Sequence, residues 1–114
     1  MSKLVDNVEH SIPFDLAGVV NYETGKIASR TLSKQPGVNM TLMAFDAGEG
    51  VSTHAAPGDA MACILDGEAE ITIDGKAQIA KAGQALVMPS GIPHAVKAVT
   101  AFKMLLIVVK QTQK

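Results

Sequence analysis

The sequence predicts an all-β protein, a sandwich or barrel of short antiparallel strands. Turn signals built from glycine, proline, aspartate and serine recur at short intervals along its 114 residues. The runs between them are short and often β-branched, and none carries a sustained helical apolar period. Closely spaced turns between such runs are typical of sandwiches and barrels. Hydrophobic residues make up 47% of the chain, which is enough to build one core.

The N-terminal third is expected to supply elements that precede the main body. Residues 16–22 (LAGVVNY) and 26–32 (KIASRTL) are predicted strands, and residues 11–15 (SIPFD) a possible extended arm. We see no repeat or linker, so one domain is the expectation. Its predicted bounds are 1–114, with the barrel over about 38–110 and the N-terminal strands or arm over 1–37.

Residues 68–79 predict the clearest hairpin in the chain. Polar and apolar side chains alternate from Glu68 to Ile73, so one face of this strand is polar and the other apolar. The pair Asp74-Gly75 tolerates the positive φ angles of a tight turn. The strand is therefore expected to resume at Lys76 and return beside the first.

Residues 60–65 (AMACIL) and 101–109 (AFKMLLIVV) are apolar on both faces. Such strands belong in the interior of a sheet, or they give one face to a partner subunit. The second option motivates the prediction of a homodimer. Cys63 shares its face with Met61 and Leu65, so we interpret it as a small buried hydrophobic residue rather than a reactive thiol.

Charge and composition exclude several classes of function. The net charge is −1, the ten basic residues are scattered, and aromatic residues make up only 4%, which argues against nucleic acid as a partner. The N-terminus has no apolar signal segment, and the apolar run 104–109 is too short to cross a bilayer. A single cysteine cannot form an internal disulfide. We therefore expect a soluble, cytoplasmic protein with no membrane partner.

Two glycine-framed histidines carry a more specific signal. Gly48 is followed by five residues and then His54, and Gly67 closes this first stretch. In the second, Gly83 is followed by five residues and then by Pro89-Ser90-Gly91, two residues and His94.

With these two stretches in this order, the sequence resembles the cupin superfamily. The resemblance covers roughly the C-terminal two thirds of the chain. It implies a double-stranded β-helix, which is a small jelly-roll barrel and is often dimeric.

The resemblance also implies a metal site, of which this chain keeps a part. Cupins bind a divalent metal such as Fe, Mn, Ni or Zn through two His and a Glu of the first motif and a His of the second. Here His54 and His94 match, whereas the other His falls on Ala56, the Glu on Ala60 and the terminal Asn of the second motif on Ala98. The remaining pair would bind metal weakly, or would be inherited histidines bonded to each other or to water.

A third ligand would have to come from outside the motif positions. Asp59 is the nearest candidate, and it would face the histidines only if a bulge at Pro57-Gly58 turned it inward. His10 could reach them only if the N-terminal arm folded over the barrel mouth.

The alanines leave volume for neighbouring side chains or for a ligand. Several methionines could form an adaptable apolar lining or simply fill the core: Met40, Met43, Met61, Met88 and Met104. The predicted ligand pocket consists of His54, His94, Ala56, Ala60, Met43 and Met88.

Three functions remain open at this point. The first is a small-molecule-binding barrel with an incomplete, two-histidine metal site, in which the rings hydrogen-bond a carboxylate or carbonyl of the ligand. The second is a metal-dependent enzyme resembling the cupin dioxygenases and isomerases, which would use His54, His94 and Asp59. The third is a regulatory or structural module that acts through dimer contacts. We favour the first.

Overall fold

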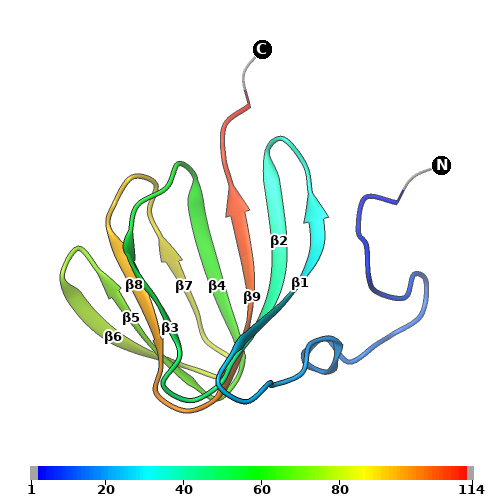
Figure 1. Cartoon of the computed structure of the whole chain (residues 1–114). Coiled ribbons are helices and arrows are strands. Elements are labelled where there is room, and N and C mark those ends of the chain that lie inside the picture. Colours follow the sequence, from blue (N-terminus) through cyan, green and yellow to red (C-terminus); the bar gives the residue numbers. More distant parts are fainter. Residues whose placement is uncertain (1–2, 113–114) are drawn as a thin grey trace.

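Residues 3–112 of the chain are described by a computed structural model. Nine strands in this part of the chain form two antiparallel sheets that face each other (Figure 1). The larger sheet has the strand order β1-β2-β9-β4-β7 and the smaller one β3-β8-β5-β6. The strand bounds are β1 Ile27–Lys34, β2 Val38–Phe45, β3 Gly50–His54, β4 Asp59–Asp66, β5 Glu68–Ile73, β6 Lys76–Lys81, β7 Ala85–Met88, β8 His94–Ala98 and β9 Phe102–Val109. The all-β prediction is confirmed.

The predicted hairpin is formed by β5 and β6. Glu68 pairs with Lys81 and Ile73 with Lys76, without a register shift. Asp74 and Gly75 between them have φ angles of 50° and 80°, the left-handed values that a two-residue hairpin turn requires. On the apolar face of β5, Ala69 and Ile71 are fully buried.

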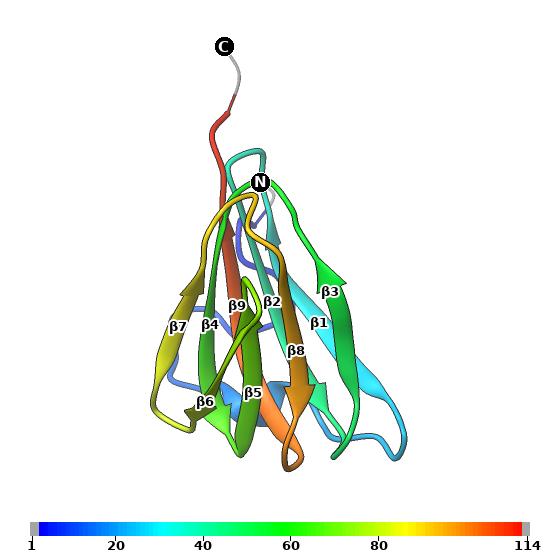
Figure 2. The same cartoon turned by 90° about the vertical axis from the view of Figure 1, so that its left-hand side faces the viewer.

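The main core lies between the two sheets, which Figure 2 shows one in front of the other. Within this core the rings of Phe45 and Phe102 stack with their centroids 4.5 Å apart. Both side chains are fully buried. They join the end of β2 to the start of β9, and Ile64 and Ile71 complete the core from β4 and β5.

A second apolar cluster lies on the outer face of the larger sheet. Its buried members are Leu32, Leu42 and Ala44 from the sheet and Val20 from the N-terminal segment. That segment runs along the side of the larger sheet that faces away from the smaller one (Figure 1). It is fastened to β1 by three hydrogen bonds. The Asp6 amide donates to the Leu32 carbonyl and Ser33 Oγ to the Leu4 carbonyl, each at 2.6 Å, and Asn7 Nδ2 donates to the Thr31 carbonyl at 2.7 Å.

The expectation of a strand at residues 16–22 was wrong, whereas that at 26–32 is confirmed by β1. Ala17–Val19 forms a single 3-10 turn (η1), which the Gly18 amide closes on the Asp15 carbonyl at 3.1 Å. The apolar side chains of this stretch cover the face of the sheet instead of pairing at its edge. Burial of this kind needs no strand, so an apolar run alone could not decide the backbone conformation.

The strands that are apolar on both faces, β4 and β9, lie in the interior of the larger sheet. On β4, Ala60, Ala62 and Ile64 point into the core, and Met61 and Cys63 point outward. The N-terminal segment covers only part of this outer face. Among the residues left exposed on this face are Met61, Val87 and Val109. A second copy of the chain could cover them, and the homodimer expected from the sequence stays a prediction. No helix within residues 3–112 is long and apolar enough to span a membrane.

Tyr22 anchors the N-terminal segment to the larger sheet. Its hydroxyl donates a hydrogen bond to Oδ2 of Asp66 at the end of β4. Lys103 Nζ lies 4.9 Å from the centroid of the Tyr22 ring and donates to the Ala17 carbonyl at 2.7 Å. Burial of the phenol raises the pKa of Tyr22, and the hydrogen bond to Asp66 and the negative charge of that carboxylate raise it further.

The raised pKa predicts how this anchor responds to alkali. The folded protein holds the Tyr22 proton more tightly than the unfolded chain does, so this stabilisation is complete below about pH 10 and is lost as the pH rises further. Tyr22 is the only tyrosine and tryptophan is absent, so phenolate absorbance reports this residue alone. We expect its titration midpoint to be higher in native than in urea-unfolded protein, and Asp66→Asn to lower the native midpoint. Equal midpoints would contradict the anchor.

Candidate functional site

The two motif histidines meet across neighbouring strands of the smaller sheet. His54 ends β3, His94 begins β8, and the two are paired directly in the ladder between these strands. Their rings are 4.4 Å apart between centroids, with an interplanar angle of 66°. Two residues far apart in the sequence thus form one edge-to-face pair.

A β-bulge in β3 allows His54 to face the barrel interior. Val51 pairs with Val96 and His54 with His94, so Ser52 and Thr53 together oppose the single residue Ala95. Strict alternation from Val51 would turn Thr53 inward and His54 outward. The extra residue shifts the alternation by one, which is a common role of bulges beside binding sites.

The turn before β8 fixes the second histidine. Gly91 has a φ of 74°, and the Ile92 amide donates to the Pro89 carbonyl at 3.2 Å. The Gly91 amide also donates to the Ala56 carbonyl at 3.0 Å, which ties this turn to the loop after β3. The two loops lie at the same end of the barrel as the C-terminal end of β9 (Figure 1).

Each ring is oriented by a backbone carbonyl two residues before it. Nδ1 of His54 is 2.9 Å from the Ser52 oxygen, and Nδ1 of His94 is 3.2 Å from the Ile92 oxygen. Within residues 3–112, neither Nε2 atom takes part in a hydrogen bond. His94 is buried, with 7% of its surface exposed, whereas His54 lies at the exposed rim.

The histidine pair lines a cavity of about 260 Å³ inside this end of the barrel. All six residues of the predicted pocket line it: His54, His94, Ala56, Ala60, Met43 and Met88. The other lining residues are Val51, Pro57, Gly58, Val96, Met104, Leu106 and Val108. The lining therefore contains no charged side chain, and its only polar side chains are the two imidazoles.

Strand parity explains which of the five methionines reach the cavity. Met104 joins Met43 and Met88 at the cavity. Met40 and Met61 do not, because they lie on the outer face of the larger sheet, where Met40 packs under the N-terminal segment and Met61 is 37% exposed. Alternation along residues 38–45 and 60–65 could have separated these two groups.

The same alternation indicates a polar residue that the sequence analysis did not single out. Asn39 shares the inner face of β2 with Met43 and pairs with Val108, which lines the cavity. Its Oδ1 atom is the one buried side-chain nitrogen or oxygen within residues 3–112 that has no hydrogen-bond partner. An unpaired buried oxygen accepts a donor readily, so Asn39 is a further polar group beside this end of the barrel.

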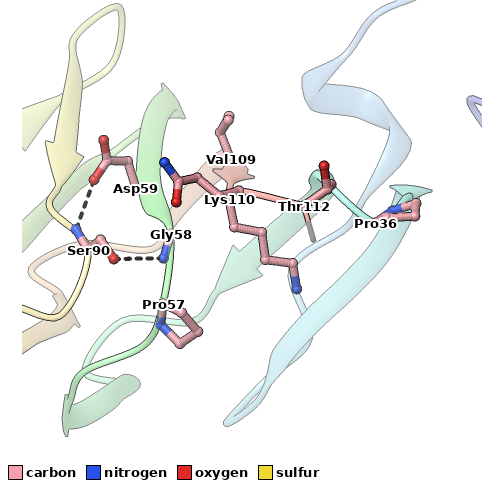
Figure 3. Close-up of a pocket in the computed structure, with 9 residues that line it drawn as sticks. Pro36, Pro57, Gly58, Asp59, Ser90, Val109, Lys110 and Thr112 are labelled. Atoms are coloured by element: carbon pink, nitrogen blue, oxygen red, sulfur yellow. Dashed lines mark hydrogen bonds between the residues drawn. The ribbon is translucent and has the colours of Figure 1, made fainter. Parts of the chain in front are cut away.

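Asp59 lies apart from the histidines. Its Oδ1 accepts a hydrogen bond from the Ser90 amide at 2.8 Å, and Ser90 Oγ accepts one from the Gly58 amide at 2.9 Å (Figure 3). The residue lines a separate open groove of about 760 Å³ outside the barrel, together with Lys110. The Asp59 carboxylate is not turned toward the histidines by a bulge at Pro57-Gly58. It instead accepts the hydrogen bond from the Ser90 amide.

The donor set at the cavity does not fit a resident divalent metal. Within residues 3–112, no three His, Cys, Asp or Glu side chains are placed where they could share an ion. Stable sites for zinc or iron use three or four protein ligands, and the cavity offers two imidazoles. His10 adds none, because its Nε2 bonds the Val5 carbonyl at 2.7 Å in the N-terminal segment.

The comparisons with known proteins agree with this architecture. The family model described as the cupin domain matches residues 41–110. The chain belongs to the cupin family. The cupin jelly-roll that the two motifs implied is therefore shown. None of the curated proteins matches the chain.

Solved structures include close relatives of this cupin. A conserved protein of unknown function from Streptococcus pyogenes is 44% identical, with 98% of each chain covered and a TM-score of 0.94. A cupin superfamily protein from Desulfitobacterium hafniense is 30% identical over 94% of this chain and 98% of its own, with a TM-score of 0.89. A cupin 2 conserved barrel domain protein from Leptotrichia buccalis is 50% identical over 85% of this chain but only 47% of its own, with a TM-score of 0.83.

A more distant likeness shows the fold alone. A salicylate 1,2-dioxygenase from Pseudoaminobacter salicylatoxidans is 18% identical over 73% of this cupin and 26% of its own chain, with a TM-score of 0.68.

Proposed function

We propose that this cupin binds a small, largely apolar molecule in its barrel cavity, with His54 and His94 as the polar groups that orient it. The observation that carries the proposal is the cavity itself, which holds two imidazoles with unbonded Nε2 atoms in an otherwise apolar lining. Binding sites commonly combine a mainly apolar wall with a few placed polar groups.

The size of the cavity limits the ligand. A cavity of about 150 Å³ in another protein holds benzene, whereas sites for drug-sized ligands start at roughly 300 Å³. At about 260 Å³, this cavity has room for one substituted ring or a branched chain of similar size. Met43, Met88 and Met104 give the wall flexible side chains that can adapt to such a shape.

A metal-dependent reaction finds less support in this geometry. That alternative requires a third ligand such as Asp59, whose carboxylate is engaged with Ser90 outside the barrel. Ser52 and Thr53 lie in the bulge and do not line the cavity. We therefore propose binding and assign no catalytic residue.

The methionine side chains allow a test of ligand binding in the cavity, because some line the cavity and others, on the outer face, serve as controls. We expect phenol, added at millimolar concentration to protein labelled with ¹³C at the methionine methyls, to shift the signals of Met43, Met88 and Met104. The signals of Met40 and Met61 on the outer face should not move, because the sheet separates them from the cavity.

A pair of matched substitutions checks the location. Ala60→Leu places a larger side chain in the cavity and should abolish these shifts, whereas Ala85→Leu, at the exposed first residue of β7, should leave them unchanged. Thermal unfolding of both variants controls for the fold. Equal shifts at the three cavity methionines and at Met40 and Met61, or none at the three cavity methionines of the unsubstituted protein, would refute the proposal.

A further inference from the structure

The hydrogen bonds of the two histidines determine which ring nitrogen carries the proton. Nδ1 of His54 faces the Ser52 carbonyl and Nδ1 of His94 faces the Ile92 carbonyl. A carbonyl oxygen can only accept, so Nδ1 must be the donor in both rings. In the neutral imidazole the other nitrogen, Nε2, then has a lone pair and no proton.

Both Nε2 atoms are therefore acceptors that the protein leaves without a donor. No hydrogen bond within residues 3–112 uses either of them, although both rings line the cavity. At His94 this matters most, because the side chain is 93% buried, the complement of its 7% exposure. Nε2 of His94 keeps some contact with solvent, because Asn39 Oδ1 is the one fully buried side-chain nitrogen or oxygen without a partner within residues 3–112. A ligand that fills the cavity would displace this solvent and would then have to donate a hydrogen bond to the nitrogen in its place.

The rest of the lining disfavours an anionic ligand in this cavity, because an anion there would also be left without a partner. No lysine or arginine reaches the cavity, and its other side chains are apolar. A carboxylate placed there would lose its hydration without meeting a cation, and its oxygens would face two lone pairs. A carboxylate or carbonyl of the ligand was the expected partner of the rings, and the orientation of the rings argues against both.

We propose that the ligand of this cavity is a small neutral alcohol or phenol whose hydroxyl donates a hydrogen bond to Nε2 of His54 or His94. This inference rests on the proposed function, since it requires that the cavity binds a small molecule. It goes further by fixing the direction of the hydrogen bond and the charge of the ligand. The apolar part of the molecule packs against Met43, Met88 and Met104.

Four one-ring probes separate the possibilities: phenol, anisole, toluene and benzoate. Phenol can donate, anisole has the same oxygen without a proton, toluene has no oxygen, and benzoate is an anion. At about pH 8, where free imidazole is neutral and phenol keeps its proton, dissociation constants are measured from the cavity methionine signals. We expect phenol to bind roughly three- to tenfold more tightly than each of the others, the usual net effect of one hydrogen bond.

The outcomes distinguish this inference from the proposed function. If anisole or toluene binds as tightly as phenol, the cavity is a binding site but the donor inference is wrong. If benzoate binds most tightly, the inference is also wrong, because the rings then act as donors or cations. If none of the four shifts the cavity signals, the proposed function itself fails.

Substitution of the rings tests which group accepts the hydrogen bond. In the double variant His54→Phe/His94→Phe we expect phenol to lose its advantage over anisole. The control His10→Phe changes the remaining histidine, which lies in the N-terminal segment, and should keep the advantage. The comparison of probes on the unsubstituted protein remains decisive if the double variant does not fold. A preference for phenol that survives in a folded double variant would overturn the assignment to the histidines.

Discussion

Gly67→Ala is expected to lower the free energy of unfolding by about 2–5 kcal/mol. Gly67 joins β4 to β5 with a φ of 74°, a conformation that costs an alanine about 1–2 kcal/mol. An added Cβ would also lie 2.0 Å from the Ala101 carbonyl oxygen. Forcing these two backbone segments apart adds about 1–3 kcal/mol. Urea denaturation of the variant and the unsubstituted protein measures the difference.

Gly75→Ala is the matched control for this prediction. Gly75 has a similar φ of 80°, but an added Cβ there would meet no atom within 4 Å. We therefore expect it to cost only the conformational part, about 1–2 kcal/mol. Equal losses in the two variants would show that the close approach of Gly67 to Ala101 has no energetic weight.

Phe102→Ala should destabilise the protein by about 3–5 kcal/mol, because it opens a void in the main core. Its ring is fully buried and stacked on Phe45. A double-mutant cycle with Phe45→Ala should give a coupling of about 0.5–1.5 kcal/mol from the stacked pair. The exposed Phe14 serves as the control, since Phe14→Ala should change stability by less than about 1 kcal/mol. Additive losses at Phe45 and Phe102 would contradict a coupled pair.

Local sequence patterns predicted the strands and turns whose conformation depends mainly on neighbouring residues. The alternation from Glu68 to Ile73 and the Asp74-Gly75 turn predicted β5 and β6, because a half-buried strand and a tight turn are written in neighbouring residues. The apolar stretch at residues 16–22 was misread as a strand. Its side chains are buried by covering a sheet, and this tertiary contact leaves the same apolar pattern as a strand does.

The convergence of the candidate site residues was predictable where the spacing of the motifs carries the information. The glycine and proline framework around His54 and His94 indicated that the two rings converge. These rings, the alanines at the other motif positions of the first stretch, and two of the methionines proposed as an apolar lining border one cavity. The bulge at Ser52 and Thr53 depends on the register between β3 and β8, which no local pattern specifies.

Which ring nitrogen donates and which accepts could not be predicted from the sequence, for a similar reason. It depends on the carbonyls of Ser52 and Ile92, which the backbone places only after folding. The sequence gives no sign of which ring nitrogen these carbonyls meet.

A crystal structure of the protein soaked with 4-bromophenol tests the central claim most directly, because the anomalous signal of bromine locates the ring. Our account predicts bromine inside the barrel near Met43, Met88 and Met104, with the phenol oxygen about 2.7–3.0 Å from Nε2 of His54 or His94. Bromine only in the outer groove beside Asp59, or a phenol oxygen turned away from both rings, would contradict it.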